Sequence, residues 1–247
     1  NNKSRVRKLT KVEVSALYNS KIKCPVCEAT IEYTKVRSKS IRLIKQDTDF
    51  CPWYEGENPV FYEAVICPEC GYGSHVTTFE KINRYEKAKV KEIITPKWTK
   101  RSFTGHRTIE KALEAFKIVL MNLTSMEAKK SEIAKICLRI AWLYRYEGNK
   151  EQEDRFLEHA LKNYKIAYHS EELSDGKFDE YVCMFIIGEL SKRLGKLSDS
   201  SQWLSRLISC YSDPSQKYRI SSRLIETTRE LIQEIKDIKA NQQAEGA

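Results

Sequence analysis

The sequence lacks the segments and motifs by which membrane proteins and the common enzyme classes are recognised. No hydrophobic run approaches the ~20 residues that a membrane-spanning helix needs, and the longest is Tyr181–Gly188. It has neither a zinc-protease HExxH motif nor a GxSxG nucleophile elbow, and its four histidines are dispersed. These absences predict a protein that has no membrane span and is not an enzyme.

The spacing typical of a disulfide framework is also absent. Four of the eight cysteines fall into two close pairs, and the others are scattered: Cys51, Cys137, Cys183 and Cys210. Such usage predicts a reducing compartment, which we take to be the cytoplasm. Because the chain opens at Asn1 rather than Met, the sequence leaves open a targeting segment on the native N-terminus.

The most informative feature that is present is a pair of CPxC motifs separated by 39 residues. Four thiolates delivered as two close pairs suit the tetrahedral shell of a structural zinc ion. The sequence therefore predicts one structural Zn²⁺, with these ligands: Cys24, Cys27, Cys67 and Cys70. Proline fixes φ inside each turn, and Gly71 tolerates a positive φ at the exit of the second, where the first has Glu28.

Two alternative interpretations of these cysteines are open. Cys51 or His75 could replace one ligand, although a closed four-thiolate site needs neither. A redox-active CxxC typically opens a helix after a strand, and the second motif is followed by Gly-Tyr-Gly, which opens no obvious helix. Zinc is the favoured interpretation.

The formal charge of +9 is unevenly distributed along the chain. Residues 1–50 carry 12 Lys/Arg and 5 Asp/Glu, residues 51–80 carry none and 5, and residues 81–111 carry 10 and 3. The remainder is neutral, with 21 of each. Such a basic region can meet nucleic acid or an acidic protein surface, or can simply balance the −2 charge of a four-thiolate zinc site.

Hydrophobic periodicity divides the chain into three stretches and predicts an α+β protein. Residues 1–85 read as a small, zinc-stapled, β-rich module with short strands, residues 86–107 as a basic connector, and residues 108–247 as an all-α domain. The strands are expected at Val12–Tyr18, Ile31–Val36, Ser40–Lys45, Val60–Cys67 and Ser74–Phe79. The last helix has apolar residues at alternating spacings of four and three, as in a coiled coil. Because this seam covers only about two heptads, a capping helix is favoured over a coiled coil.

The helical stretch contains a weak internal repeat. Ala141, Tyr144, Gly148 and Ala160 stand at the spacing of a tetratricopeptide repeat. Gly188 and Gly195 repeat the seven-residue interval, with turn glycines 47 residues apart and an insertion expected around Ser170–Lys177. The pattern predicts tetratricopeptide-like helical pairs, with a generic helical bundle as the alternative.

Several segments together resemble a known bacterial family. They are Asp47–Cys51, Tyr54–Tyr62, Val65–Tyr72, Ala141–Arg145 and Ile187–Gly195. In this order they are similar to domain-of-unknown-function family 2225. The resemblance implies a bacterial, cytoplasmic protein with paired-cysteine and tetratricopeptide-like parts, and it implies no activity.

The loop between the CPxC motifs is unusually long for a zinc ribbon. It gathers carboxylates, phenols and an amide downstream of two arginines: Arg37, Arg42, Asp47, Asp49, Tyr54, Asn58 and Tyr62. One interpretation is a pocket for a ligand or peptide. The other is internal bracing, in which Asp47 and Asp49 cap turns or pair with Arg37 and Arg42.

These features favour a non-enzymatic adaptor that binds a protein partner in a helical-repeat groove, with Tyr144 expected to face that groove. The alternative is an RNA- or DNA-binding protein. Its candidate contacts lie in the basic connector, among Lys91, Lys97, Trp98, Lys100 and Arg101. The sequence does not indicate the oligomeric state.

Overall fold

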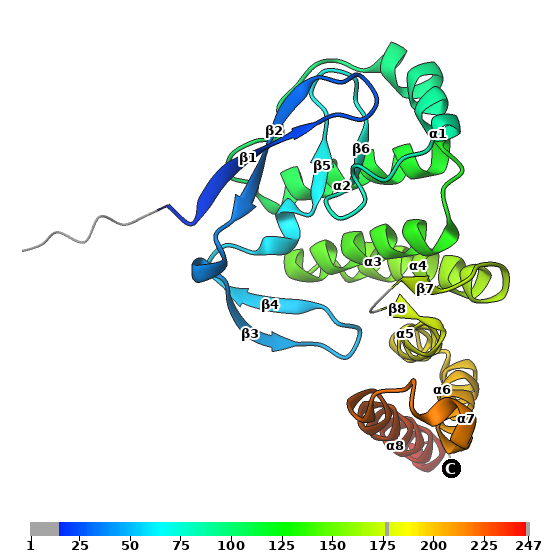
Figure 1. Cartoon of the computed structure of the whole chain (residues 1–247). Helices are drawn as coiled ribbons and strands as arrows, with labels where there is room; N and C mark the ends of the chain where they lie inside the picture. The colour runs from blue at the N-terminus through cyan, green and yellow to red at the C-terminus, as the bar shows by residue number, and fades with distance from the viewer. Residues whose placement is uncertain (1–14, 176–177, 246–247) are drawn as a thin grey trace, which may run out of the picture.

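A computed structural model describes residues 15–175 and 178–245 and shows the expected α+β layout. Within those residues the strands form four two-stranded sheets and are accompanied by eight α-helices (Figure 1). Short β-hairpins make up the N-terminal part, and helices make up the rest. Among the described residues, none of the helices combines the length and apolar character needed to cross a bilayer.

Three antiparallel hairpins build the N-terminal part. The first pairs β1 (Leu17–Lys23) with β2 (Thr30–Val36) around the first CPxC turn. The second pairs β3 (Arg42–Gln46) with β4 (Pro52–Glu55), and its register shifts between Leu43 and Lys45. The third pairs β5 (Ala64–Ile66) with β6 (Gly73–His75) around the second CPxC turn. Each cysteine pair therefore sits in the turn of its own hairpin.

The basic connector is folded against the turn of the third hairpin, where Thr95 donates to Cys70 O and Trp98 to Pro68 O. It begins with α1 (Arg84–Lys89), whose N-terminus has a capping box formed by Asn83 and Glu86. A π-helical turn (Val90–Ile94) and a 3₁₀ turn (Thr95–Lys97) follow. Val90 and Ile94 are buried, so the connector belongs to the folded body.

The helical part begins with α2 (Ile109–Ser125), which packs on β5 and β6. Two helical hairpins follow, α3 (Lys130–Glu147) with α4 (Lys150–Ser170) and α5 (Glu180–Arg193) with α6 (Leu197–Ser212). Gly148 and Gly195 make the two hairpin turns with φ of 79° and 72°, the left-handed conformation that glycine adopts at little cost. The helical pairing that the repeat pattern predicts is confirmed.

The C-terminal elements cover the second helical pair. The short α7 (Pro214–Lys217) leads into α8 (Ser222–Glu245), which packs on α5 and α6. Ile225, Thr228, Leu231 and Ile235 of α8 are almost fully buried. Contacts within the chain therefore account for its apolar stripe, as expected for a capping helix.

The buried core crosses the expected domain boundaries. One cluster of buried side chains runs from Cys24 in the first hairpin to Leu190 in α5, and a second joins α5, α6 and α8. The boundaries at residues 85 and 107 stay predictions, but the apolar packing is continuous across both. Buried side chains of the N-terminal hairpins pack together with those of α2 and α3 in one core, since a two-stranded sheet alone is too small to form a hydrophobic core.

The strand predictions differ from the structure at several places. β1 begins at Leu17, so it shares Leu17 and Tyr18 with the strand expected at Val12–Tyr18, and residues 12–14 lie outside the described part. β4 was not expected, because Pro52 and Trp53 stand in a run punctuated by turn residues. The insertion expected around Ser170–Lys177 coincides with the end of α4 and a small hairpin, β7 (Ser174–Asp175) and β8 (Phe178–Asp179); residues 176 and 177 lie outside the described part.

Gly188 allows the close crossing of α5 and α6. A Cβ atom at this position would lie 2.5 Å from Leu204 Cδ2, and Leu204 is fully buried. We expect Gly188→Ala to lower the free energy of unfolding by about 1–3 kcal/mol, because overpacking forces the buried leucine out of its rotamer. Denaturant titration measures this, and a second change, Leu204→Ala, should make Gly188→Ala less costly. Equal costs of Gly188→Ala in both backgrounds would contradict the steric explanation.

Candidate metal centre and the buried charge network

The four predicted zinc ligands meet at one point. Their Sγ atoms all lie within 4.8 Å of one another, with Cys24 and Cys70 3.7 Å apart and Cys27 and Cys67 3.6 Å apart. Four sulfurs placed about 2.3 Å from a central zinc ion in a tetrahedron stand about 3.8 Å from one another. The cluster therefore has the donor type and the spacing of a closed, structural four-thiolate zinc site.

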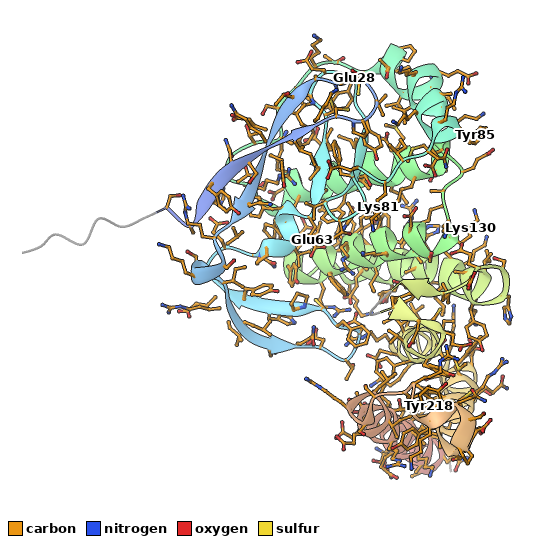
Figure 2. The ribbon with its side chains drawn as sticks, viewed as in Figure 1. Glu28, Glu63, Lys81, Tyr85, Lys130 and Tyr218 are labelled. Carbon is orange, nitrogen blue, oxygen red and sulfur yellow. The ribbon has the colours of Figure 1, made fainter. Side chains whose placement is uncertain are left out.

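Backbone geometry prepares both turns in the same way. The N–H of Glu28 donates to Cys24 O (2.9 Å), and that of Gly71 donates to Cys67 O (3.0 Å). Both residues leave their turn with positive φ, 64° for Glu28 and 77° for Gly71. Glu28 thus adopts the conformation that glycine adopts more readily, and its side chain is exposed where Figure 2 labels it.

The connector and α2 hold the second turn from outside. Trp98 lies against Gly71, where a Cβ atom would be 2.6 Å from the indole, and its Nε1 donates to Pro68 O (2.8 Å). Thr95 Oγ1 donates to Cys70 O (3.0 Å), and Asn122 Nδ2 donates to Gly71 O (3.1 Å). The glycine in the second turn is therefore required twice, by its φ and by the tryptophan that covers it.

The thiols of the cluster are electrostatically coupled. Hydrogen bonds from Cys67 and Cys70 lower the pKa of Cys24, and hydrogen bonds with Cys24 and Cys67 raise the pKa of Cys70. The backbone N–H groups of Cys27 and Val26 also favour the Cys24 thiolate. A site that stabilises thiolate in this way suits a divalent cation, which binds the deprotonated form.

The substitute ligands considered from the sequence lie elsewhere. Cys51 Sγ donates to Tyr146 Oη (3.4 Å), and burial raises the pKa of this thiol to about 12. His75 lies between Thr77 and Glu63, with its Nε2 3.1 Å from Glu63 Oε2. Neither belongs to the cysteine cluster, which is complete without them.

A second site lies at the tip of the β3–β4 hairpin, where two carboxylates meet an arginine of α3. Asp49 is fully buried and receives hydrogen bonds from Arg145 Nη1 (2.9 Å), Arg145 Nη2 (2.7 Å) and Trp142 Nε1 (3.1 Å). Asp47 receives Arg145 Nη1 (2.9 Å) and Trp53 Nε1 (2.9 Å), and Arg145 Nε donates to Glu153 of α4 (2.7 Å). The guanidinium of Arg145 therefore serves three carboxylates.

These contacts fix the charge state of the network. Burial alone raises the pKa of Asp47, but Trp53 and Arg145 outweigh it and lower that pKa. Burial disfavours the charged form of Arg145, yet the hydrogen bonds and charge of Asp49 raise its pKa. The network is therefore a set of buried ion pairs in which each partner stabilises the charged form of the other.

The same hairpin tip also reaches α5. Thr48 donates to Glu189, Arg193 Nη2 lies 3.5 Å from Asp49 Oδ1, and the ring of Phe50 packs 5.6 Å from that of Phe185. Phe50 has a φ of 68°, a left-handed conformation that costs free energy for a side chain of this size. Residues 47–50 therefore contact both α3 and α5, and Figure 1 shows the end of the β3–β4 hairpin beside these helices.

The structure separates the residues that the sequence grouped around this loop. Arg37 donates to Ser15 O (3.0 Å) and lies over the Tyr18 ring, while Arg42 pairs with Glu55 at 3.6 Å. The expected pairing of Asp47 and Asp49 with these arginines is wrong, because Arg145 and Arg193, which come much later in the chain, provide the positive charge. Asp47 and Asp49 do brace the structure internally, but they pair with arginines of α3 and α5 and not with Arg37 and Arg42.

Tyr54 and Asn58 lie together on a surface pocket of ≈ 400 Å³ between the hairpin, α2 and α3. Trp53, Phe61 and Tyr146 form further parts of its wall. Asn58 also caps a 3₁₀ turn (Pro59–Tyr62) by accepting the N–H of Val60, and Tyr62 donates to Glu57 (2.9 Å). Asn58 and Tyr62 therefore stabilise the local structure beside the pocket.

Tyr144 does not face a groove. It is 7% exposed and stacks on Phe156 of α4, with ring centroids 5.7 Å apart. The expectation that this side chain contacts a partner is therefore wrong for the folded state, since the tyrosine packs inside the α3–α4 pair. Its repeat-like position reflects helix packing.

The connector residues proposed for nucleic-acid contact are partly engaged within the chain. Lys100 pairs with Glu69 (2.5 Å), and Arg101 pairs with Glu114 (3.2 Å) and stacks on Trp98 (4.8 Å). Lys91 and Lys97 are exposed. Trp98 supports the second cysteine turn on one side and carries Arg101, so its ring is not open for stacking with a base.

The residues that sequence reasoning missed are the helical members of the network: Trp142, Arg145, Glu153, Glu189 and Arg193. The sequence does contain a signal for a buried charge, because Arg145 is the one charged residue in the otherwise apolar and aromatic run Ile140–Tyr146. A buried charge in a helix requires a partner, but nothing in the sequence specifies that the partner lies 96 residues away.

Fold and site together define a four-cysteine module fused to a short array of helical hairpins. The chain belongs to the DUF2225 family, described as uncharacterized proteins conserved in bacteria, whose profile matches residues 17–235. No curated protein and no solved structure matches the chain. The match spans both cysteine pairs and both helical hairpins.

We expect Cys24→Ser and Cys70→Ser each to abolish stoichiometric zinc binding and to lower Tm. Zinc binding is coupled to the folding of so small a module, so loss of one thiolate weakens both. Metal content by atomic emission and thermal unfolding by circular dichroism measure the two effects. Cys51→Ser is the control and should retain about one zinc ion per chain, as a closed four-thiolate site requires; a wild-type protein that purifies without metal and unfolds at an unchanged Tm after chelation would contradict the assignment.

We expect Asp49→Ala to destabilise the protein by about 3–5 kcal/mol, because it leaves the buried Arg145 without its main counter-charge. The exposed ion pair of Lys150 with Asp154 provides the control, and Asp154→Ala should cost less than about 1 kcal/mol. Urea titration of both variants gives the comparison. Similar costs for the two would show that the buried network is not a stabilising constraint.

Proposed function

We propose that the protein is a non-enzymatic, zinc-binding adaptor that binds a protein partner. The observation that carries the proposal is the β3–β4 hairpin, which is anchored at its tip by buried ion pairs and exposes apolar side chains along its outer strand. Ile41 is 38% exposed, Leu43 is 56% exposed and Ile44 is 67% exposed. Adjacent exposed aliphatic residues on an anchored element are typical of an interaction site.

The position of the hairpin changes where the partner is expected. The sequence favoured a helical-repeat groove as the binding site. In the folded chain, however, residues 47–50 contact α3 and α5. The helical pairs then act as a scaffold that holds the hairpin, and the hairpin is the element presented to the partner.

The absence of catalysis is supported by the use of the buried polar groups. Asp49 and Arg145 are bound to each other, and burial raises the pKa of Glu189, which Arg193 and Thr48 contact. Perturbed pKa values accompany structural ion pairs as well as active sites. Here burial accounts for the shift of Glu189, and the ion pair with Asp49 accounts for that of Arg145.

A nucleic-acid partner is the second candidate. The exposed Lys91 and Lys97 and the excess of positive charge in residues 81–111 favour it. Against it, Trp98, Lys100 and Arg101 have partners within the protein. Free thiols at all eight cysteines agree with a reducing compartment such as the bacterial cytoplasm, where we expect the adaptor to act.

A tagged pull-down from a lysate of the source bacterium at physiological salt tests the proposed function. One half of the lysate is treated with nuclease, and we expect the same defined protein to be recovered from both halves. Because phosphate contacts are strongly salt-dependent, a nucleic-acid interaction would also weaken steeply between low and physiological salt. Recovery of nucleic acid, with every protein lost after nuclease treatment, would overturn the adaptor in favour of the second candidate.

A further inference from the structure

We propose that the outer strand of the β3–β4 hairpin inserts its apolar side chains into an apolar cleft, rimmed by carboxylates, on a folded protein partner. This inference rests on the proposed adaptor function and adds the surface and the chemistry of the partner. The docking surface is defined by Ile41, Leu43 and Ile44 together with the basic residues Lys39, Arg42 and Lys45. It is called the hairpin surface below.

The apolar part of the hairpin surface is concentrated in a very short segment. Its three aliphatic residues are among eight large hydrophobic side chains exposed in the described part of the chain, and the others are scattered over α1, α2, α4, α8 and the segment before α8. Every residue of β3 is exposed, whereas Trp53 and Tyr54 of β4 are half-buried. The hairpin thus turns β4 toward the body and β3 toward solvent.

The charged residues that define this surface are all basic, and Lys45 among them pairs with Asp47 (3.6 Å) and lies over the Trp53 ring. Residues 33–46 contain five Lys/Arg and no Asp/Glu. The ion pair of Arg42 with Glu55 is solvent-exposed on both sides, with side chains 74% and 67% exposed. Exposed pairs of this kind are weak, so an incoming carboxylate competes for Arg42 at little cost. Electrostatic complementarity therefore favours a partner with an acidic rim.

The backbone of β3 argues against two other modes of docking. The register shift leaves Ile44 as an extra residue between the pairs Leu43–Tyr54 and Lys45–Trp53, which is a β-bulge. Bulges and basic side chains on an edge strand disfavour the addition of a further strand. A second copy pairing edge to edge would also place like charges together. The side chains of the hairpin surface, and not its backbone, are therefore the docking elements.

Ile44 is the most exposed of the three aliphatic residues of the hairpin surface, and it is the extra residue of the β-bulge. Ile44 has no cross-strand partner in the register and is 67% exposed, so its side chain projects from the hairpin as an apolar knob. A knob requires a cavity in the partner, because a flat surface buries only one side of it. Interface cores of this kind are apolar and are surrounded by a polar rim.

Site-specific photocrosslinking in the lysate of the source bacterium tests the inference on the full-length protein. Benzoylphenylalanine replaces Ile44 in one variant and Tyr218 in the control, which is 82% exposed and lies in the C-terminal part of the chain (Figure 2). We expect one protein adduct from position 44 and none of it from position 218. Peptide mapping should place the adduct in a segment that combines Asp or Glu with apolar residues.

Three variants separate the apolar and charged contributions, with the partner identified by the adduct as the probe. Leu43→Ser should weaken binding by about tenfold or more, as truncation of a hot-spot residue does. Arg42→Gln with Lys45→Gln should mainly reduce the association rate and its salt dependence. Ile166→Ser removes an exposed isoleucine of α4 and should leave binding unchanged. These residues are exposed, so an unchanged Tm verifies that each variant is folded.

The outcomes are distinguishable. If the partner of the pull-down is still captured at full affinity by Leu43→Ser and by the charge variant, the hairpin surface is wrong while the adaptor function stands. Adducts to a second copy of the chain or to nucleic acid, or binding only to phosphatidylglycerol vesicles, would each replace the inferred partner with that occupant. No adduct at position 44, or the same adducts from position 218, would overturn the inference.

Discussion

The carboxylate of Asp49 is the constraint on which the arrangement of this protein depends. It is fully buried, where an ionised group requires a cation and hydrogen-bond donors. Arg145 and Trp142 of α3 supply them, and Arg193 of α5 lies close by. Because these partners belong to two different helical hairpins, a single side chain fixes the β3–β4 hairpin against both.

The cysteine cluster and the Asp49 network restrain the same segment at different points. The 39 residues between Cys27 and Cys67 are fixed at both ends by the cluster, and their middle is fixed by Asp49. Two restraints divide one long loop into two shorter ones and so reduce the entropy that each must lose. A loop that is long for a zinc ribbon can therefore be ordered, with one strand, β3, left exposed.

The contact of the chain with its own helical hairpins has a consequence for how such proteins are interpreted. Helical hairpins stacked side by side leave a surface on which extended segments can bind. In this chain residues 47–50 contact α3 and α5 through polar contacts and a ring contact between Phe50 and Phe185. The repeat-like part is therefore best understood as support for the N-terminal part, which is where the exposed apolar residues gather.

The cysteine cluster and the helical hairpins followed from the sequence because each depends on local spacing. Two CPxC turns bring four sulfurs into two pairs, and Gly148 and Gly195 mark turns that only residues tolerant of positive φ make easily. The family resemblance extended this to the order of the parts. β4, the partners of Asp47 and Asp49, and the burial of Tyr144 did not follow, because each is decided by residues distant in the chain.

The sequence alone determined the two cysteine pairs that form the cluster, the helical periodicity and the position of the turns, since these are set by interactions among residues that are close in the chain. Only the tertiary structure decided that Arg145 serves Asp49, that Trp98 supports Gly71 and that Ile44 points into solvent. The physical reason is that burial and charge pairing depend on which surfaces meet after folding. A buried carboxylate requires a positively charged partner, and only the packed structure determines which residue is that partner.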